Sequence, residues 1–308
     1  MDMASLFDAK TFTSSKGTKL NYRIYLPKDY DAREEYPLIL FLHGAGQRGD
    51  DNFSQLKLGI NEPFKQTDSE IYNCIVVAPQ CPTTDKWVNV PDWGYCGYDT
   101  TKISESESLS AVVELLENLQ STYSVDGNRL YVTGLSMGGF GTWDLLVRHP
   151  DLFAAAMPLC GGVDYRQASK IKEIPIWTFH GQQDETVPCV GTEKMVEELE
   201  KLNGNCIYTP MPDSGHVIWT EVYAREDVIP WLLSHHLSNG EEIYEPIETE
   251  AQTVDRIDDT SVDTANSEEG NAFSKLGCNG SVGVSALTVA TVVAGAVIAT
   301  KKRKTDSK

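Results

Sequence analysis

The sequence has little positive charge. Its 26 lysines and arginines stand against 45 aspartates and glutamates, which gives a formal net charge of -19. A nucleic-acid-binding surface needs a basic patch to neutralise phosphates, so this balance argues against nucleic acid as a partner. The acidity itself says nothing about a reaction, because it mainly affects solubility.

The cysteines lack the spacing of a metal site. Seven are present, but none forms a CxxC pair or a Cys/His cluster with zinc spacing, so we expect no structural metal. Cys74 and Cys160 lie in apolar runs, which are typical of buried core thiols. Cys81 and Cys96 flank one loop. They either form a disulfide, if the protein is exported, or stay free.

The N-terminal segment 1–10 has neither the basic nor the apolar region of a secretory signal peptide. At the other end, residues 282–299 form an 18-residue run without charge, followed by the basic sequence 301–304. Its length is at the short end for a membrane-spanning helix, and the basic cluster is typical of the cytoplasmic side. We expect segment 276–308 to be a membrane anchor with the globular part outside the cell. A cytoplasmic location is the alternative, because export needs a signal.

Between these ends the composition predicts two regions. Residues 10–238 have the apolar content of a globular domain. Residues 239–275 predict an acidic disordered linker, because eleven acids between positions 240 and 270 accompany a single basic residue, Arg256. Such a segment buries too little apolar surface to offset its ordering entropy.

Strand and helix patterns alternate through the globular part. Apolar or alternating runs predict strands, and apolar residues at helical spacing predict helices between them. This alternation predicts an α/β fold with a mainly parallel sheet and helices on both faces. The expected strands are 20–26, 37–42, 74–78, 129–133, 154–159, 174–179 and 206–209, and the expected helices are 108–119, 136–149, 192–202 and 217–237.

One motif points to chemistry. Gly134-Leu135-Ser136-Met137-Gly138 matches G-x-S-x-G, with a predicted strand before it and a predicted helix after it. That setting gives a sharp turn which lifts the serine hydroxyl above the carboxyl edge of the sheet, beside a helix N-terminus that favours developing negative charge. We therefore expect Ser136 to be a nucleophile.

A serine hydroxyl needs a base, and the base needs an orienting acid. In hydrolases with this motif the chain order is serine, acid, histidine. Asp184 follows the late strand 174–179, with Glu185 and Asp213 as competitors, and His216 follows the strand 206–209. The other histidines are expected in turns, at helix ends or on the surface. His43 and His180, each before a glycine at a strand end, are expected to shape turns.

The oxyanion of an acyl-transfer intermediate needs two backbone donors. We expect one to be the N–H of Met137, directly after the nucleophile. The second is expected from the loop after strand 37–42, where Ala45 is the first choice and Gly46 the alternative.

These blocks together resemble bacterial α/β hydrolases of the polyhydroxybutyrate-depolymerase, feruloyl-esterase and phospholipase/carboxylesterase group. The resemblance rests on LFLHGAGQRGDDN, VVAPQCP, RLYVTGLSMGGFGTWDL, HPDLFAAAMPLCGG, IPIWTFHGQQDETVP and the late SGH, and it covers residues from about 18 to 237. It implies the α/β-hydrolase fold, carboxylic ester hydrolysis through an acyl-enzyme without metal or organic cofactor, and a triad of Ser136, Asp184 and His216. The C-terminal linker and apolar helix depart from the group's usual form.

The loop 79–101 follows a predicted strand and is rich in aromatic residues. Trp87, Trp93 and Tyr98 are expected substrate contacts; the alternative is that they only pack the loop down. By family analogy, we expect a feruloyl or acetyl ester on plant polysaccharide. Two other functions stay open: a serine peptidase similar to prolyl oligopeptidases, and an inactive surface binding protein on the same fold.

Overall fold

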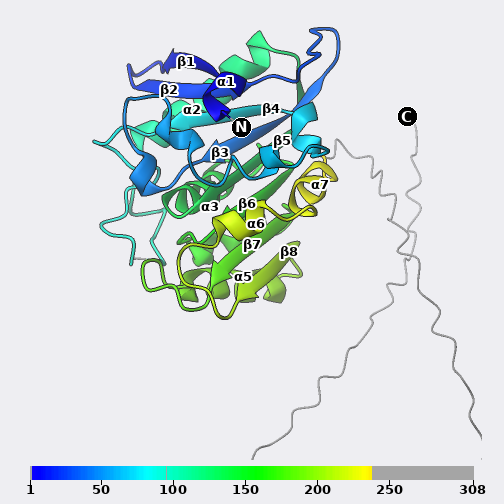
Figure 1. Ribbon diagram of the computed structural model, residues 1–308. Coiled ribbons are helices and arrows are strands. Elements are labelled where there is room, and N and C mark those ends of the chain that lie inside the picture. Colours follow the sequence, from blue (N-terminus) through cyan, green and yellow to red (C-terminus); the bar gives the residue numbers. More distant parts are fainter. Residues whose placement is uncertain (1, 95, 238–308) are drawn as a thin grey trace, which may run out of the picture. The chain divides into compact units, whose positions relative to one another are not determined.

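An eight-stranded sheet forms the centre of the computed structural model, which describes residues 2–94 and 96–237 (Figure 1). The strand order is β1-β2-β4-β3-β5-β6-β7-β8. The first two strands pair antiparallel, as do β2 and β4, and all other pairs are parallel, which confirms the expected mainly parallel sheet. The strands are β1 Asp8–Thr13, β2 Lys19–Tyr25, β3 Tyr36–Leu42, β4 Ile75–Gln80, β5 Val125–Leu135, β6 Ala155–Leu159, β7 Ile176–Gly181 and β8 Cys206–Met211.

The central strands are buried on both faces, as their continuous apolar runs predict. In β3, Leu38, Leu40 and Leu42 point into one hydrophobic cluster. The alternate residues Ile39 and Phe41 point into the other. A strand whose every side chain is apolar can sit only at the centre of such a sheet, because successive side chains face opposite sides.

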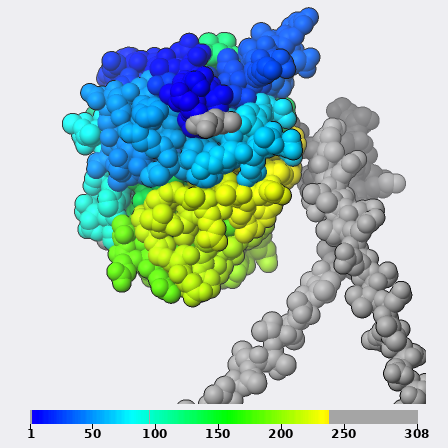
Figure 2. Space-filling model, viewed as in Figure 1, coloured from blue at the N-terminus to red at the C-terminus, as the bar shows by residue number. Residues whose placement is uncertain are grey.

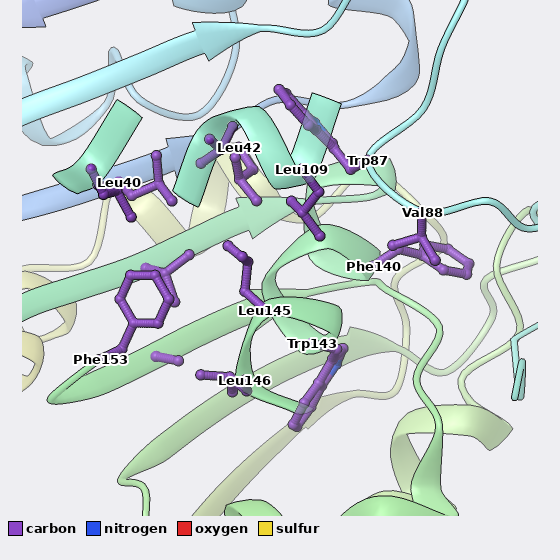
Figure 3. Packing of buried hydrophobic residues seen from close by; sticks show 14 of the residues in the cluster. Leu40, Leu42, Trp87, Val88, Leu109, Phe140, Trp143, Leu145, Leu146 and Phe153 are labelled. Carbon is purple, nitrogen blue, oxygen red and sulfur yellow. The ribbon is translucent and has the colours of Figure 1, made fainter. Parts of the chain in front are cut away.

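Helices cover both faces of the sheet. The longer helices α2 Glu107–Thr122, α3 Met137–Arg148 and α5 Val190–Lys201, with the short α4 Ala168–Ile171, pack on the cluster that contains Leu40 and Leu42. Figure 3 shows these two leucines with Leu109 of α2 and Phe140 and Leu145 of α3. The opposite face is covered by α6 Trp219–Tyr223, α7 Val228–Leu233 and short 3-10 turns.

The second face joins segments that are distant in sequence. The 3-10 turns η2 Ser54–Leu56, η3 Pro63–Lys65 and η4 Glu70–Asn73 share a cluster with α6 and α7. Figure 2 shows this face, where the blue to cyan N-terminal part adjoins the yellow end of the described chain. A hydrogen bond of 2.9 Å from the Gln66 side chain to the Ala224 carbonyl ties the two parts together. The remaining short elements are α1 Met3–Leu6, η1 Ala45–Gln47 and η5 Tyr165–Gln167.

Strand β1 and the last expected helix differ from the sequence prediction. Strand β1 was not expected, because its residues are largely exposed and carry no apolar alternation. The single helix expected over 217–237 is wrong, since two short helices, α6 and α7, stand in its place. The cause is Pro230, whose ring would clash with the carbonyl four residues earlier in a continuous helix. A proline is tolerated only in a first turn, which is its place in α7.

Within residues 2–94 and 96–237, no helix combines the length and apolarity needed to cross a bilayer. The expected linker 239–275 and anchor 276–308, including the run 282–299, lie outside the described residues.

The turn between β5 and α3 depends on close backbone packing. A Cβ atom at Gly138 would lie 1.8 Å from the carbonyl oxygen of Leu42, at the end of β3. At Gly134 a Cβ atom would lie 2.4 Å from the carbonyl oxygen of Gly138. Both neighbours are backbone atoms and cannot move aside as a flexible side chain does, so the turn needs glycine at these two positions.

We predict that Gly138→Ala lowers the free energy of unfolding by about 3 kcal/mol or more, because the added methyl group overlaps backbone. Gly127→Ala is the control, since its Cβ would meet only the Gln120 side chain at 3.7 Å. That control should cost less than about 0.5 kcal/mol. Denaturant unfolding measures both values, and equal stabilities would contradict the packing argument.

The loop after β3 is held by a buried histidine. The Nδ1 of His43 lies 2.7 Å from the Gly44 carbonyl oxygen, and its Nε2 accepts a 3.0 Å hydrogen bond from the Cys81 N–H. The indole N–H of Trp87 donates to the His43 carbonyl at 3.0 Å. Burial lowers the pKa of His43 from 6.5 to about 4, so the ring is neutral above that range.

This shift predicts a pH-dependent stability. The unfolded chain binds a proton at His43 below about pH 6.5, whereas the folded protein resists it until about pH 4. Stability should therefore fall as the pH drops through this window, by about 3 kcal/mol from this residue. Denaturant unfolding of the wild type and His43→Gln between pH 7 and 4 measures the difference. Parallel pH profiles for the two proteins would refute the assignment.

Candidate active site

Four strand ends supply the candidate site. Each parallel strand ends at the same edge of the sheet, which is where α/β proteins bind ligands. The oxyanion loop begins after β3, Ser136 follows β5, Asp184 follows β7 and His216 follows β8. The structure brings the last three side chains, far apart in sequence, into hydrogen-bonding distance.

Ser136 occupies a strained backbone conformation. Its φ of 56° and ψ of -120° lie outside the regions that non-glycine residues prefer. The N–H of Ser136 donates to the Leu159 carbonyl of β6 at 2.9 Å, which ties the strained residue to the next strand. Strain of this kind costs about 1–3 kcal/mol and persists only where the surroundings enforce it, most often at functional sites.

A hydrogen-bonded chain links Ser136, His216 and Asp184. The Nε2 of His216 lies 2.8 Å from the Ser136 Oγ, and its Nδ1 lies 2.7 Å from the Asp184 Oδ2. A carboxylate only accepts, so Nδ1 carries the proton and Nε2 is free to accept the serine proton. Glu185 and Asp213, the competing acids, are both exposed.

The Asp184 carboxylate is buried but surrounded by donors. Its Oδ1 accepts from the backbone N–H groups of Thr186 at 2.9 Å and Val187 at 2.8 Å. Burial raises the pKa of Asp184, but the adjacent His180 ring and the bonds from His216 and the Val187 N–H outweigh it, so the pKa lies well below its ordinary value. The carboxylate is therefore ionised at neutral pH and suited to orient His216.

The two expected oxyanion donors belong to segments that approach Ser136. Met137 is the first residue of α3, a position whose N–H has no acceptor within the helix. The loop after β3 also approaches Ser136, since a Cβ atom at Gly44, one residue before Ala45, would lie 3.6 Å from the Ser136 Cβ. In the part of the chain that the structure describes, no hydrogen bond occupies the N–H of Ala45.

The expectation that Trp87 and Tyr98 contact substrate is corrected by their burial. Both side chains are 0% exposed, so they present no surface to a ligand. Tyr98 stacks on Phe140 at 6.1 Å between ring centroids, and Trp87 belongs to the same core cluster. These two residues pack the loop down. Trp93 differs, because it is only half-buried and packs edge-on against Phe140.

The cysteines near this loop are free thiols, so Cys81 and Cys96 form no disulfide. Among the described residues, one group has donor atoms close enough to hold a metal: Cys160, Asp184 and His216, within 4.8 Å of one another. Burial raises the pKa of the Cys160 thiol to about 12, which disfavours the thiolate that a metal binds. The 2.7 Å hydrogen bond between Asp184 and His216 also occupies both partners.

One residue beside the triad was not assigned to it from the sequence. His180 was expected to shape a turn, but its Nε2 lies 3.3 Å from the Asp184 Oδ2, and the ring is fully buried. In the sequence, the one indication of this contact is that His180 stands four residues before Asp184, across the end of a strand.

Known proteins resemble the chain in sequence and in fold. A solved thermostable esterase is 35% identical, with a TM-score of 0.68, over 75% of this chain and 64% of that one. A probable feruloyl esterase C of Aspergillus niger is 26% identical over 215 residues, which are 68% of this chain and 73% of that protein. A bifunctional acetylxylan esterase/xylanase of Neocallimastix patriciarum is 25% identical over 177 residues, 57% of this chain; the match spans 23% of that protein's length.

The family assignment follows from a match to a family model. The model of the phospholipase/carboxylesterase family matches residues 30–226, which include Ser136, Asp184 and His216. The chain thus belongs to the phospholipase/carboxylesterase family of hydrolases.

Proposed function

We propose that the protein hydrolyses carboxylic esters through an acyl-enzyme formed on Ser136. The single observation that carries this proposal is the hydrogen-bonded chain of Ser136, His216 and Asp184, at 2.8 and 2.7 Å. In the first step His216 Nε2 takes the Ser136 proton as the oxygen attacks the ester carbonyl, and then gives it to the leaving alcohol. A water molecule activated by the same nitrogen releases the acid.

Two features of the site favour the transition state. The ionised Asp184 stabilises the imidazolium that forms on His216 during each step. The N–H groups of Met137 and Ala45 are proposed to donate to the oxyanion. Loss of one such donor typically costs about 10²–10³ in kcat.

For the substrate we propose an ester of a phenolic or acetyl group on plant polysaccharide. The names of the similar feruloyl and acetylxylan esterases support this class. Two residues add support for an aromatic acyl group. Trp93 is only partly buried, and Val217, next to His216, is 69% exposed, so apolar surface adjoins the base.

The triad proposal predicts selective labelling of Ser136. A fluorophosphonate probe should modify the folded wild-type protein, and mass spectrometry should place the adduct on Ser136. Ser136→Ala and His216→Ala should each remove nearly all turnover, and the double variant should be scarcely worse, because the residues act as a unit. Unlabelled wild type, or losses that add, would exclude this mechanism.

The substrate proposal predicts a preference among model esters. Methyl ferulate, acetylated xylan, p-nitrophenyl acetate and proline amides form the panel, in which the amides test for a peptidase. Trp93→Ala should raise KM for methyl ferulate about threefold to tenfold, the range of an aromatic contact, and leave p-nitrophenyl acetate nearly unchanged. Trp93→Phe should restore most of the loss. Turnover of the amides alone would replace the ester proposal with a peptidase.

A further inference from the structure

A second histidine lies against the Asp184 carboxylate. His180, near the end of β7, is fully buried. Its Nε2 lies 2.8 Å from the Val187 carbonyl oxygen and 3.3 Å from the Asp184 Oδ2. On the other side of the ring, Nδ1 lies 2.8 Å from the Thr192 Oγ1 of α5. Both ring nitrogens are therefore engaged, and one of them faces the triad.

These contacts fix the protonation of the ring. The Val187 carbonyl oxygen only accepts, so Nε2 carries a proton. Nδ1 then accepts from the Thr192 hydroxyl, for which the Gly161 carbonyl, at 3.3 Å, is the longer alternative. In this tautomer the Nε2 proton points at Val187, and the positive edge of the ring also faces Asp184.

The contacts of His180 and Asp184 converge on one short turn. Val187 accepts from His180 through its carbonyl oxygen and donates to the Asp184 Oδ1 through its N–H. His180 thereby lies against the Asp184 Oδ2 and binds Val187, the residue that donates to Oδ1. Loss of the ring would release both sides of the carboxylate.

We propose that His180 is a positioning residue of the active site, which holds Asp184 ionised and in place so that Asp184 can orient His216. This inference rests on the proposed esterase function. It assigns two of the six histidines of the chain to one carboxylate: His216 transfers protons at the reacting atoms, and His180 acts only through Asp184.

A packing role alone would have a different effect on the pH profile. The titratable groups that face Asp184 are His180, His216, Cys160 and Cys189. Without His180, the carboxylate loses the positive ring edge that lies 3.3 Å from Oδ2, and its charge interacts more strongly with the protonated His216 ring. The acidic limb of the kcat/KM profile, which reports protonation of the base, should then move to higher pH. A loss of packing would lower stability without moving this limb.

The experiment compares two matched pairs of variants in the full chain. His180→Leu removes both ring contacts, whereas His180→Gln keeps a donor near the Nε2 position. Thr192→Val removes the hydroxyl that holds Nδ1, whereas Thr192→Ser keeps it. The measurements are kcat and KM for p-nitrophenyl acetate from pH 5 to 9, the rate of fluorophosphonate labelling, and thermal unfolding.

We expect His180→Leu to lower kcat about 10-fold to 100-fold, the range that loss of a buried hydrogen-bond partner covers, with KM little changed. Its labelling should slow in parallel, and its acidic limb should move to higher pH. His180→Gln should recover much of the rate. Thr192→Val should show a smaller loss in the same direction, and Thr192→Ser should retain most activity even where His180→Leu folds poorly.

Two failures are distinguishable. If the wild type neither turns over esters nor labels at Ser136, the proposed function fails. If the wild type is active but both pairs keep wild-type kcat and pH profiles, only the role of His180 is overturned. A fall in kcat without a shift of the acidic limb also overturns it, because that result assigns His180 to packing.

Discussion

The contact between the start of α3 and the end of β3 is the constraint on which the site depends. With no side chain at Gly138, the helix backbone lies directly against the Leu42 carbonyl. This approach fixes the turn in which Ser136 takes its positive φ, and it places the loop that begins at His43 beside the same serine. One close approach of two backbones therefore sets both the proposed nucleophile and the expected oxyanion donors, and side chains play little part in it.

The acid side of the site is organised differently, through hydrogen bonds to a buried charge. A carboxylate as buried as Asp184 is costly unless donors surround it. Two backbone N–H groups and two histidine rings face its oxygens. The turn after β7 thus carries the polar network that lets an ionised acid exist beside the core. His216, which follows β8, is oriented by its hydrogen bond to this network.

The sequence predicted the parallel sheet and the three hydrogen-bonded residues because both depend on local order. Continuous apolar runs specify buried strands, and strand ends specify the edge where Ser136, Asp184 and His216 lie. It did not predict the break in the last helix, where Pro230 outweighed a helical apolar pattern. The sequence also led to the expectation that Trp87 and Tyr98 contact substrate, because aromatic composition does not reveal which ring faces the core. His180 was assigned to a turn because its partner, the Val187 carbonyl, becomes visible only in three dimensions.

The difference between strand ends and loops explains why the sequence predicts the chemistry of the site better than its substrate. The residues proposed to react sit on strand ends, whose positions follow from a regular sheet. The loop 79–101, by contrast, is held by particular side chains: Asp164 accepts from the Thr100 N–H and hydroxyl, and the Lys86 ammonium lies over the Trp93 ring. Its shape depends on such pairings, which follow no repeating pattern. Two of its aromatic rings fill the core, and Trp93 is only partly buried. Substrate specificity on this fold is therefore expected to vary with how many loop aromatics the core takes up, while the strand-end chemistry stays constant.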